Sequence, residues 1–450
     1  MNRQVSNQRL WLAGRLGLTG FFFVLLTTVG LAQGPAGEPD NRRRCGTVER
    51  EAMLQRMNPL RRQQLEQLNE QLRDDTGLRK LLRLGTDETV FRIPVVVHVI
   101  HNTPGNLIGG SNNPNISDEQ IASQIQVLNE DYRRQAGTRG FNTNPVGADT
   151  GIEFFLAKTD PQGAVTNGIT RHYYPDQTAF DPYDLADANR LSQLAYWPSD
   201  RYLNIWVAPL SGRYLGYAQF PTAADTLRGL EGVTNERTDG VIIDYRYFGR
   251  QIGTVRSPTY CCGRTTTHEV GHWLGLIHTW GDAVCGDDYV YDTPTIEAAN
   301  ETGQCTALFS TCSGVRVRNQ IENYMDYSPD FCMNLFTRGQ RERMRAVLQL
   351  SPRRARLIRS VEALPPADVL TVGVIPNPVR TEATVEVQFS GFRPLQVDVF
   401  DALGRSVRTL TYPDTPSIRL TLTVDDLPAG IYVLRVRAGD ETQGKRILIK

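Results

Sequence analysis

Hydrophobic and polar positions are arranged differently in the middle of the chain and at its end. Residues 91–100 read FRIPVVVHVI, a β-branched and mostly apolar run that is typical of a buried strand. Shorter runs at 151–158, 202–208 and 241–243 predict further strands. Residues 216–220 fit an edge strand, to which an extended peptide substrate can add through backbone hydrogen bonds.

Helical spacing separates these runs. Ser117 starts a capping box, and the helix that it opens has apolar residues on one face, Ile121, Ile125 and Leu128. Residues 339–350 predict a closing helix. Residues 42–80 predict a solvated helical stretch with apolar positions at near-helical spacing, Met53, Leu54, Met57, Leu60, Leu65 and Leu68. Strands and helices are mixed through this region, so we predict an α/β (α+β) domain.

The pattern changes to strict alternation in the last 80-odd residues. Turn signals at 376–378, 402–404 and 427–430 separate the alternating segments. The alternating apolar positions are Val385, Val387, Phe389, Val397, Val399, Leu420, Leu422, Ile431 and Val433. This pattern predicts a small β-sandwich.

The first 32 residues have the features of a signal peptide. Basic residues precede an apolar run at 16–31, and small residues follow at the cleavage positions. A membrane anchor is the alternative, but the run is short for spanning a bilayer. We therefore expect export through the periplasm, and a secreted or surface-attached product. The predicted organisation is a signal peptide (1–32), a propeptide (33–82), a catalytic domain (83–362) and the β-sandwich domain (363–450).

Composition narrows the class of partner. The chain has 450 residues, with 49 basic and 49 acidic side chains and no formal net charge. This balance does not favour nucleic acid as a partner, and we expect a monomer. Export makes disulfides reasonable, and four cysteines downstream of residue 278 allow three pairings, Cys285, Cys305, Cys312 and Cys332. The neighbouring Cys261 and Cys262 can form a strained disulfide or remain free thiols.

Three histidines and a glutamate that could bind and use a metal ion lie within residues 268–278, HEVGHWLGLIH. His268 and His272 are four residues apart, so on a helix they point two imidazoles at one metal ion. Glu269 projects to the side, where it can reach a metal-bound water. Gly275 can take left-handed dihedrals, and the resulting turn returns His278 as a third ligand. Three protein ligands leave one position of a tetrahedral Zn²⁺ open, as in catalytic sites, whereas two surface histidines on an amphipathic helix would not need this extension.

Two residues downstream fit the same site. In the segment NYMDYS, Met325 would form an apolar floor beneath the three imidazoles. The phenol of Tyr327 could hydrogen-bond an oxyanion near the metal. Without the zinc motif, both residues would be read as ordinary core.

Two further features have a functional and a structural interpretation. Cys45, in RRCGT, is either an unpaired bystander or a fourth zinc ligand that keeps a zymogen inactive. A second feature is a cluster of oxygen-bearing side chains, Asp287, Asp288, Asp292 and Thr293. Hard oxygen ligands at this density suit Ca²⁺, and the alternative is an Asp-rich turn without an ion.

Taken together, these motifs resemble the pappalysin-type metzincin peptidases. The resemblance covers roughly residues 90–350 and is carried by HEVGHWLGLIHTW at 268–280, CGDDYVYDTP at 285–294 and NYMDYSPDFCMNLFTRGQRERMR at 323–345. It implies zinc held by the three histidines, Glu269 as general base and Tyr327 as the tyrosine of the Met-turn. It also implies a bound calcium ion, Cys45 as a zymogen switch, and the disulfides Cys285–Cys312 and Cys305–Cys332.

One position departs from the family pattern. Relatives prefer basic residues beside the scissile bond, and in one of them an acidic residue follows the last cysteine. Met333 occupies that position here, which argues against carrying the basic preference over. Asp326 and Asp330 are nearby in sequence and could compensate.

The end of the chain resembles the C-terminal sorting domain of proteins exported by the type IX secretion system. The resemblance is carried by PNPV at 376–379, VFDALGRSVRTL at 399–410, LPAGIYVLRV at 427–436 and KRILIK at 445–450. A carbohydrate- or protein-binding module is the alternative. The whole sequence therefore predicts a secreted, latent zinc endopeptidase that acts on proteins or peptides. A non-enzymatic adhesion protein that retains the zinc fold, and a hydrolase of another substrate, are the other readings; an intact Glu269 disfavours adhesion.

Overall fold

The computed structural model describes seven stretches of the chain, residues 45–73, 90–212, 214–222, 236–360, 370–389, 393–415 and 418–450. The predicted signal peptide, both ends of the predicted propeptide and the predicted boundary at residue 363 lie outside these stretches. Within them, no helix is long and apolar enough to cross a membrane.

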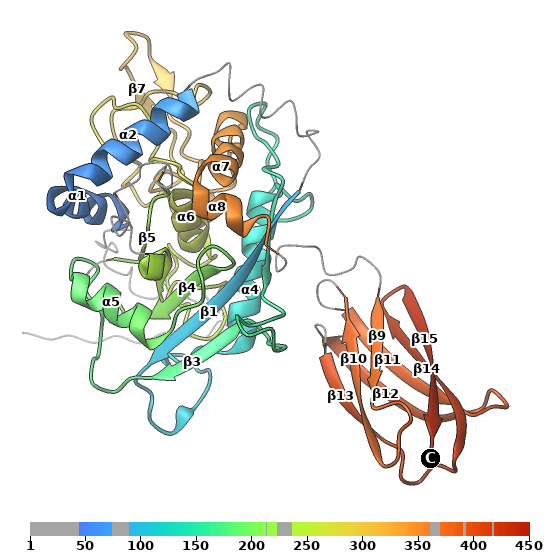
Figure 1. Ribbon diagram of the computed structural model, residues 1–450. Coiled ribbons are helices and arrows are strands. Elements are labelled where there is room, and N and C mark those ends of the chain that lie inside the picture. The colour runs from blue at the N-terminus through green and yellow to red at the C-terminus, as the bar shows by residue number, and fades with distance from the viewer. Residues whose placement is uncertain are drawn as a thin grey trace, which may run out of the picture. The chain divides into compact units, whose positions relative to one another are not determined.

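The predicted helical leader forms two helices, α1 (Thr47–Met57) and α2 (Pro59–Arg73). A buried ion pair joins them, because the Arg61 guanidinium donates to both carboxylate oxygens of Glu51 at 2.6–2.9 Å. Leu68 and Leu72 of α2 pack against Ala346 and Val347 of α7 (Arg338–Leu350). Figure 1 shows the two helices in blue; α1 is in contact with the strand β5 (Gly216–Ala218), and α2 is in contact with α7.

The predicted α/β domain is confirmed, and its centre is a six-stranded sheet. Its strands run in the order β2-β1-β4-β6-β5, and β3 pairs with the second half of β1. All pairs are parallel except β5 with β6. The strands are β1 (Phe91–His101), β2 (Ile152–Leu156), β3 (Ile169–Tyr173), β4 (Leu203–Ala208), β5 (Gly216–Ala218) and β6 (Gly240–Asp244). The segment predicted as an edge strand therefore contains the edge strand β5.

Both faces of β1 are covered, which explains its mostly apolar run. On one face Val97 and Val99 join the main core with residues of α4 (Asp118–Tyr132) and α6 (Arg264–Trp273). On the other face Ile100 packs in a second core with Leu191 of α5 (Leu185–Leu194). Short 3₁₀ turns occur at Pro104–Asn106, Glu236–Thr238 and Asp330–Cys332.

Helix α4 begins where the sequence predicts, although only half of its capping box forms. The Ser117 hydroxyl accepts from the Gln120 backbone N–H at 3.3 Å. The Gln120 side chain instead donates to the carbonyls of Tyr245 and Phe248 and to the Thr254 hydroxyl. Gln120 thus connects α4 to the segment after β6, which leads to α6.

After α6 the chain forms a loop-rich region and then two helices. The region contains the hairpin β7 (Phe309–Ser310) and β8 (Val317–Arg318), and is followed by α7 (Arg338–Leu350) and α8 (Pro352–Leu357). Two disulfides cross-link it, Cys285–Cys312 and Cys305–Cys332, which are the pairings that the resemblance implies. Cys261 and Cys262 form a vicinal disulfide, which decides between the two sequence alternatives.

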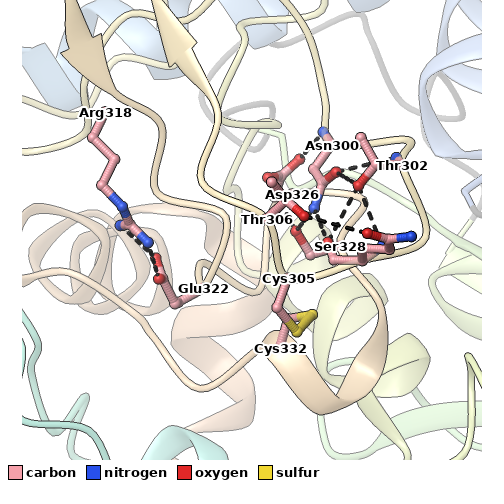
Figure 2. The surroundings of a disulfide bond; sticks show 10 residues. Asn300, Thr302, Cys305, Thr306, Arg318, Glu322, Asp326, Ser328 and Cys332 are labelled. Atoms are coloured by element: carbon pink, nitrogen blue, oxygen red, sulfur yellow. Dashed lines mark hydrogen bonds and ion pairs between the residues drawn. A yellow bond between two sulfur atoms is a disulfide. The ribbon is translucent and has the colours of Figure 1, made fainter.

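Figure 2 shows how the second disulfide organises its surroundings. The backbone N–H of Asn300 donates to Asp326 at 2.8 Å, and its side-chain amide donates to Ser328 at 2.8 Å. Cys305 and Cys332 join the same two stretches of chain covalently. The loop at residues 300–306 is therefore fixed to the segment that carries Tyr327.

The C-terminal region is the predicted β-sandwich. One sheet has the order β13-β10-β9 and the other β12-β11-β14-β15, with every pair antiparallel. The alternating positions Val385, Val397 and Leu422 lie in its core. The strands are β9 (Thr371–Ile375), β10 (Glu382–Gln388), β11 (Arg393–Phe400), β12 (Ser406–Thr415), β13 (Ile418–Thr423), β14 (Gly430–Ala438) and β15 (Glu441–Ile449).

Candidate zinc-peptidase active site

Helix α6 carries the first part of the site and is anchored at both ends. At its start, the Asp330 carboxylate accepts from the backbone N–H groups of Cys262 and Arg264 at 2.8 and 3.2 Å. A carboxylate there also interacts favourably with the helix dipole. At its end, Gly275 has a φ of +87°, the left-handed conformation that the sequence predicts. The chain turns sharply after it and returns His278 to the helix.

Three imidazoles converge as the motif predicts. The Nε2 atoms of His268, His272 and His278 lie 3.1 Å from one another in every pair, and all three side chains are buried. Each Nδ1 faces an acceptor, the carbonyl of Tyr324, the carbonyl of Leu276 or the carboxylate of Asp282. Because Nδ1 holds the proton of a neutral imidazole in each case, the three Nε2 lone pairs are directed at one point.

This donor set fits a zinc ion. Three lone pairs cannot hydrogen-bond to one another, so their convergence is favourable only around a cation. A triangle with these edges has a point about 2.0–2.1 Å from all three corners, the usual Zn–N distance. Fixing the proton on Nδ1 with an acceptor is also how proteins orient histidines that bind metals.

Cys45 completes the cluster. Its sulfur belongs with the three Nε2 atoms to a group whose ligand atoms all lie within 4.8 Å of one another. Among the stretches that the structure describes, this is the only such group of three or more His, Cys, Asp or Glu residues. Cys45 is buried and is the free cysteine of the chain. Its backbone forms a parallel bridge with Gly216 of β5, so the leader covers the edge strand.

Glu269 lies beside this cluster and is completely buried. Its Oε2 accepts from the Thr47 hydroxyl at 2.8 Å and lies 3.5 Å from the Cys45 sulfur, while Oε1 is buried without a hydrogen-bond partner. Burial raises the pKa of the Glu269 carboxyl to about 8, although the hydrogen bonds from Thr47 and Cys45 oppose the shift. A cation on the imidazoles would lower this pKa again.

Met325 contacts the helix that carries the site, and Tyr327 contacts the imidazoles themselves. The Met325 sulfur is in contact with α6 at Gly271, and its side chain is buried. The Tyr327 ring packs edge-on against His278, with centroids 4.9 Å apart. Burial raises the pKa of the Tyr327 phenol well above its usual value, so the phenol stays protonated and can donate.

A small cavity of about 20 Å³ lies next to the cluster. Met333 lines it together with His268, Glu269 and Tyr327, and so do Asp326 and Asp330. Both aspartates are buried and accept hydrogen bonds from backbone N–H groups. Asp326 accepts from Asn300 and Tyr327, and Asp330 accepts from residues at the start of α6. The carboxylates that the sequence could not place are therefore close to Met333, and each has a structural partner.

The candidate calcium ligands do not form one cluster of carboxylates. Asp292 accepts from the Thr337 hydroxyl at 2.6 Å and from the Gly339 N–H at 3.1 Å, at the start of α7. Asp288 accepts from the Thr293 hydroxyl at 2.7 Å, and burial raises the pKa of its carboxyl to about 7. Asp287 accepts from the N–H of Tyr289.

Three contacts at the site were not predicted. Thr47 binds Glu269, Asp282 orients His278, and the Trp280 indole stacks on the His278 ring with centroids 4.3 Å apart and planes 8° apart. Asp282 follows His278 by four residues, a spacing that could have suggested the pair. No local signal connects Thr47 with a carboxylate 222 residues away.

Comparison with known proteins agrees with this geometry. The family model described as pregnancy-associated plasma protein-A, peptidase M43, matches residues 189–349. An extracellular metalloprotease of Coccidioides posadasii is 35% identical over 51% of this chain and 68% of its own. One from Colletotrichum graminicola is 31% identical over 52% of this chain and 87% of its own. The chain belongs to the pappalysin family of peptidases.

Solved structures agree with this assignment. A promirolysin mutant of Tannerella forsythia is 37% identical and covers 70% of this chain and 97% of its own, with a TM-score of 0.57. Mature mirolysin of the same organism, in complex with a cleaved peptide, is 40% identical and covers 60% and 96%, with a TM-score of 0.51. Residues 373–450 match the secretion system C-terminal sorting domain. This pappalysin is therefore a secreted zinc metalloendopeptidase with a type IX sorting domain.

Proposed function

We propose that the chain is made as a latent zymogen of a zinc endopeptidase, in which His268, His272 and His278 hold the metal and Glu269 is the general base. The observation that carries this proposal is the convergence of three Nε2 lone pairs beside a buried carboxylate. A zinc ion bound there would acidify a water molecule and polarise the scissile carbonyl.

The residues around the cluster have separate roles in this proposal. Glu269 accepts the proton of the attacking water and delivers it to the nitrogen of the leaving amine. Tyr327 donates a hydrogen bond to the oxyanion that develops on the carbonyl oxygen. The free edge of β5 pairs with the backbone of an extended peptide once the leader has left it.

Latency follows from the position of the leader. Cys45 takes the place next to the imidazoles that a water molecule needs, and the leader backbone occupies the edge strand. Activation then requires removal of this segment by proteolysis. The propeptide boundaries at residues 33 and 82 stay predictions.

A test of the proposal uses the full chain, wild type and Glu269→Ala, with and without chelator. Wild-type protein should process itself and cleave a peptide library, and chelation should stop both. Glu269→Ala should bind the same amount of zinc by elemental analysis and show no turnover. Turnover at the wild-type rate by Glu269→Ala would show that Glu269 is not the general base. Zinc-loaded wild-type protein that cleaves nothing even after propeptide removal would overturn the proposal and favour the adhesion role.

The cavity at Met333 leads us to propose an apolar or small residue beside the scissile bond. Asp326 and Asp330 already accept backbone hydrogen bonds, and Met333 adds an apolar side chain to the lining of the same cavity. Sequencing the products of library cleavage checks this, since enrichment of Arg or Lys at that position would contradict it.

Calcium, oligomeric state and export route remain proposals as well. We propose that the segment with Asp287, Asp288, Asp292 and Thr293 binds Ca²⁺, on the basis of the resemblance and of its density of oxygen ligands. A rise in Tm with Ca²⁺ but not Mg²⁺ would support it, and no rise would favour the hydrogen-bonded turn. We also propose a monomer, checked by light scattering. Export would use the signal peptide at 1–32 and then the type IX machinery through 363–450, checked by deleting the latter.

A further inference from the structure

The side chain of Thr47 lies between the catalytic helix and the edge strand. Its hydroxyl donates to Oε2 of Glu269 at 2.8 Å and accepts from the backbone N–H of Ala218, on β5, at 2.8 Å. The side chain is buried, with 1% of its surface exposed. A hydroxyl has one proton to donate, and Thr47 donates it to the carboxyl group of Glu269. The same oxygen accepts from a backbone N–H of the strand that would bind substrate.

Cys45 and Thr47 occupy different parts of the same site. A water molecule that is to be activated must contact both the metal position and the Glu269 carboxylate. In the latent chain the Cys45 sulfur lies with the three imidazole nitrogens and 3.5 Å from Oε2 of Glu269, whereas the Thr47 oxygen lies 2.8 Å from the same Oε2 and makes the shorter hydrogen bond to it. The N–H of Gly46, between them, donates to the Gly216 carbonyl at 2.9 Å and fixes the spacing of the two groups.

We propose that Thr47 is a second latency residue, which occupies the general base and one substrate-binding N–H independently of the thiol of Cys45. This inference rests on the proposed function of Glu269 and deepens it. Removing the thiol alone leaves the base and the edge strand covered. The segment Cys45-Gly46-Thr47 therefore blocks the metal position and the proton acceptor with two separate side chains.

The free thiol of Cys45 gives a measurement that does not depend on activity. All the other cysteines are in disulfides, so alkylation of the native, unprocessed chain reports how often the leader opens. Thr47→Val keeps the branched shape and removes the hydroxyl, whereas Thr47→Ser keeps the hydroxyl. We expect Thr47→Val to raise the rate of alkylation, which mass spectrometry follows, on the order of 10- to 100-fold, as for loss of a buried hydrogen bond that leaves its partner unsatisfied. The rate of self-processing should rise by a similar factor.

Two comparisons decide the inference. Thr47→Ser should stay close to wild type, and equal opening in the Ser and Val variants would show that shape, not the hydroxyl, matters. In a Glu269→Gln background, Thr47→Val should have a smaller effect, because the carboxyl group that accepts from the hydroxyl is gone. An unchanged effect there, or no effect of Thr47→Val in the wild type, overturns the inference.

The same experiment separates this inference from the proposed function. If zinc-loaded wild-type protein cleaves no peptide even after the leader has been removed by proteolysis, the proposed function fails, yet the alkylation rates of the unprocessed chain still measure the hydroxyl's contribution. If wild-type protein is active and Thr47→Val opens no faster, only the role of Thr47 fails.

Discussion

The Met325 sulfur lies 2.5 Å from the position that a Cβ atom on Gly271 would occupy. The Met-turn therefore contacts α6 at the single residue of the helix that has no side chain, one position before His272. Gly271→Ala must push the thioether or the helix away, and overpacking of this kind costs about 1–3 kcal/mol. We expect a lower Tm and weaker zinc retention, measured by calorimetry and chelator competition. The double variant Gly271→Ala/Met325→Ala should lose less stability than the sum of the two single variants, and simple additivity would show that this contact does not matter.

Asp282 positions His278 and should control metal affinity. Its carboxylate accepts from His278 Nδ1 at 2.5 Å, whereas His268 and His272 use backbone carbonyls. Asp282 has a φ of +58°, which Asn tolerates, so Asp282→Asn changes the charge with little backbone cost. Zinc affinity should fall roughly 10- to 100-fold, as for other partners of metal-bound histidines. Glu301→Gln, at an exposed carboxylate, is the charge-matched control, and equal affinities in the two variants would contradict the role.

Asp239 should stabilise the catalytic domain through a buried ion pair. It accepts from Arg354 at 2.8 Å and Arg353 at 2.5 Å, and from the indole N–H of Trp273 at the end of α6. Asp239→Asn removes the charge and leaves Arg354 buried without its partner, so we expect a loss of about 3–5 kcal/mol in the free energy of unfolding. The control is Asp200→Asn, whose ion pair with Arg356 is about half exposed and should contribute under about 1 kcal/mol.

The same residue predicts a dependence of stability on pH. Burial alone would raise the pKa of the Asp239 carboxyl, but Arg354 and Arg353 outweigh burial and hold it below its usual value. A carboxyl with a depressed pKa in the folded state contributes stability above its unfolded pKa and loses it as the pH falls through its folded pKa. The free energy of unfolding should therefore decrease as the pH falls below about 4, where an ordinary Asp titrates. Urea titrations should give a shallower decrease for Asp239→Asn, and parallel curves would exclude Asp239 as a source of the slope.

Arg50 should hold the leader in place away from the chemistry. Its guanidinium donates to the Pro182 carbonyl at 2.6 Å and lies over the Tyr217 ring at 4.8 Å, and its side chain is buried. Arg50→Ala removes the hydrogen bond and the cation–π contact, which together should speed opening of the leader about tenfold or more. Alkylation of Cys45 measures this rate. Arg56→Ala, at an exposed position of the same helix, should leave the rate unchanged, and similar rates for both variants would refute the contact.

Features that depend on short-range periodicity were predictable from sequence. The spacing of His268 and His272 places both on one helical face, and Gly275 accounts for the return of His278. Residues 91–100 predicted a strand buried on both faces, and the alternation at 385–389 predicted a sandwich strand. In each case the local spacing of a few residues fixes which side of the chain must be buried.

Contacts between distant segments were decided only by the tertiary structure. Thr47 meets Glu269 across 222 residues and Asp239 meets Arg354 across 115, and neither pair leaves a local pattern. Some of the aspartates that the sequence suggested as calcium ligands accept hydrogen bonds within the protein, and Asp292 does so at the start of α7. The sequence by itself determined the zinc motif and the class of each of the two folds, because both follow from the spacing of nearby residues. Only the tertiary structure decided how the leader covers Glu269, because the Thr47 hydroxyl reaches this carboxyl group only when the leader packs against α6.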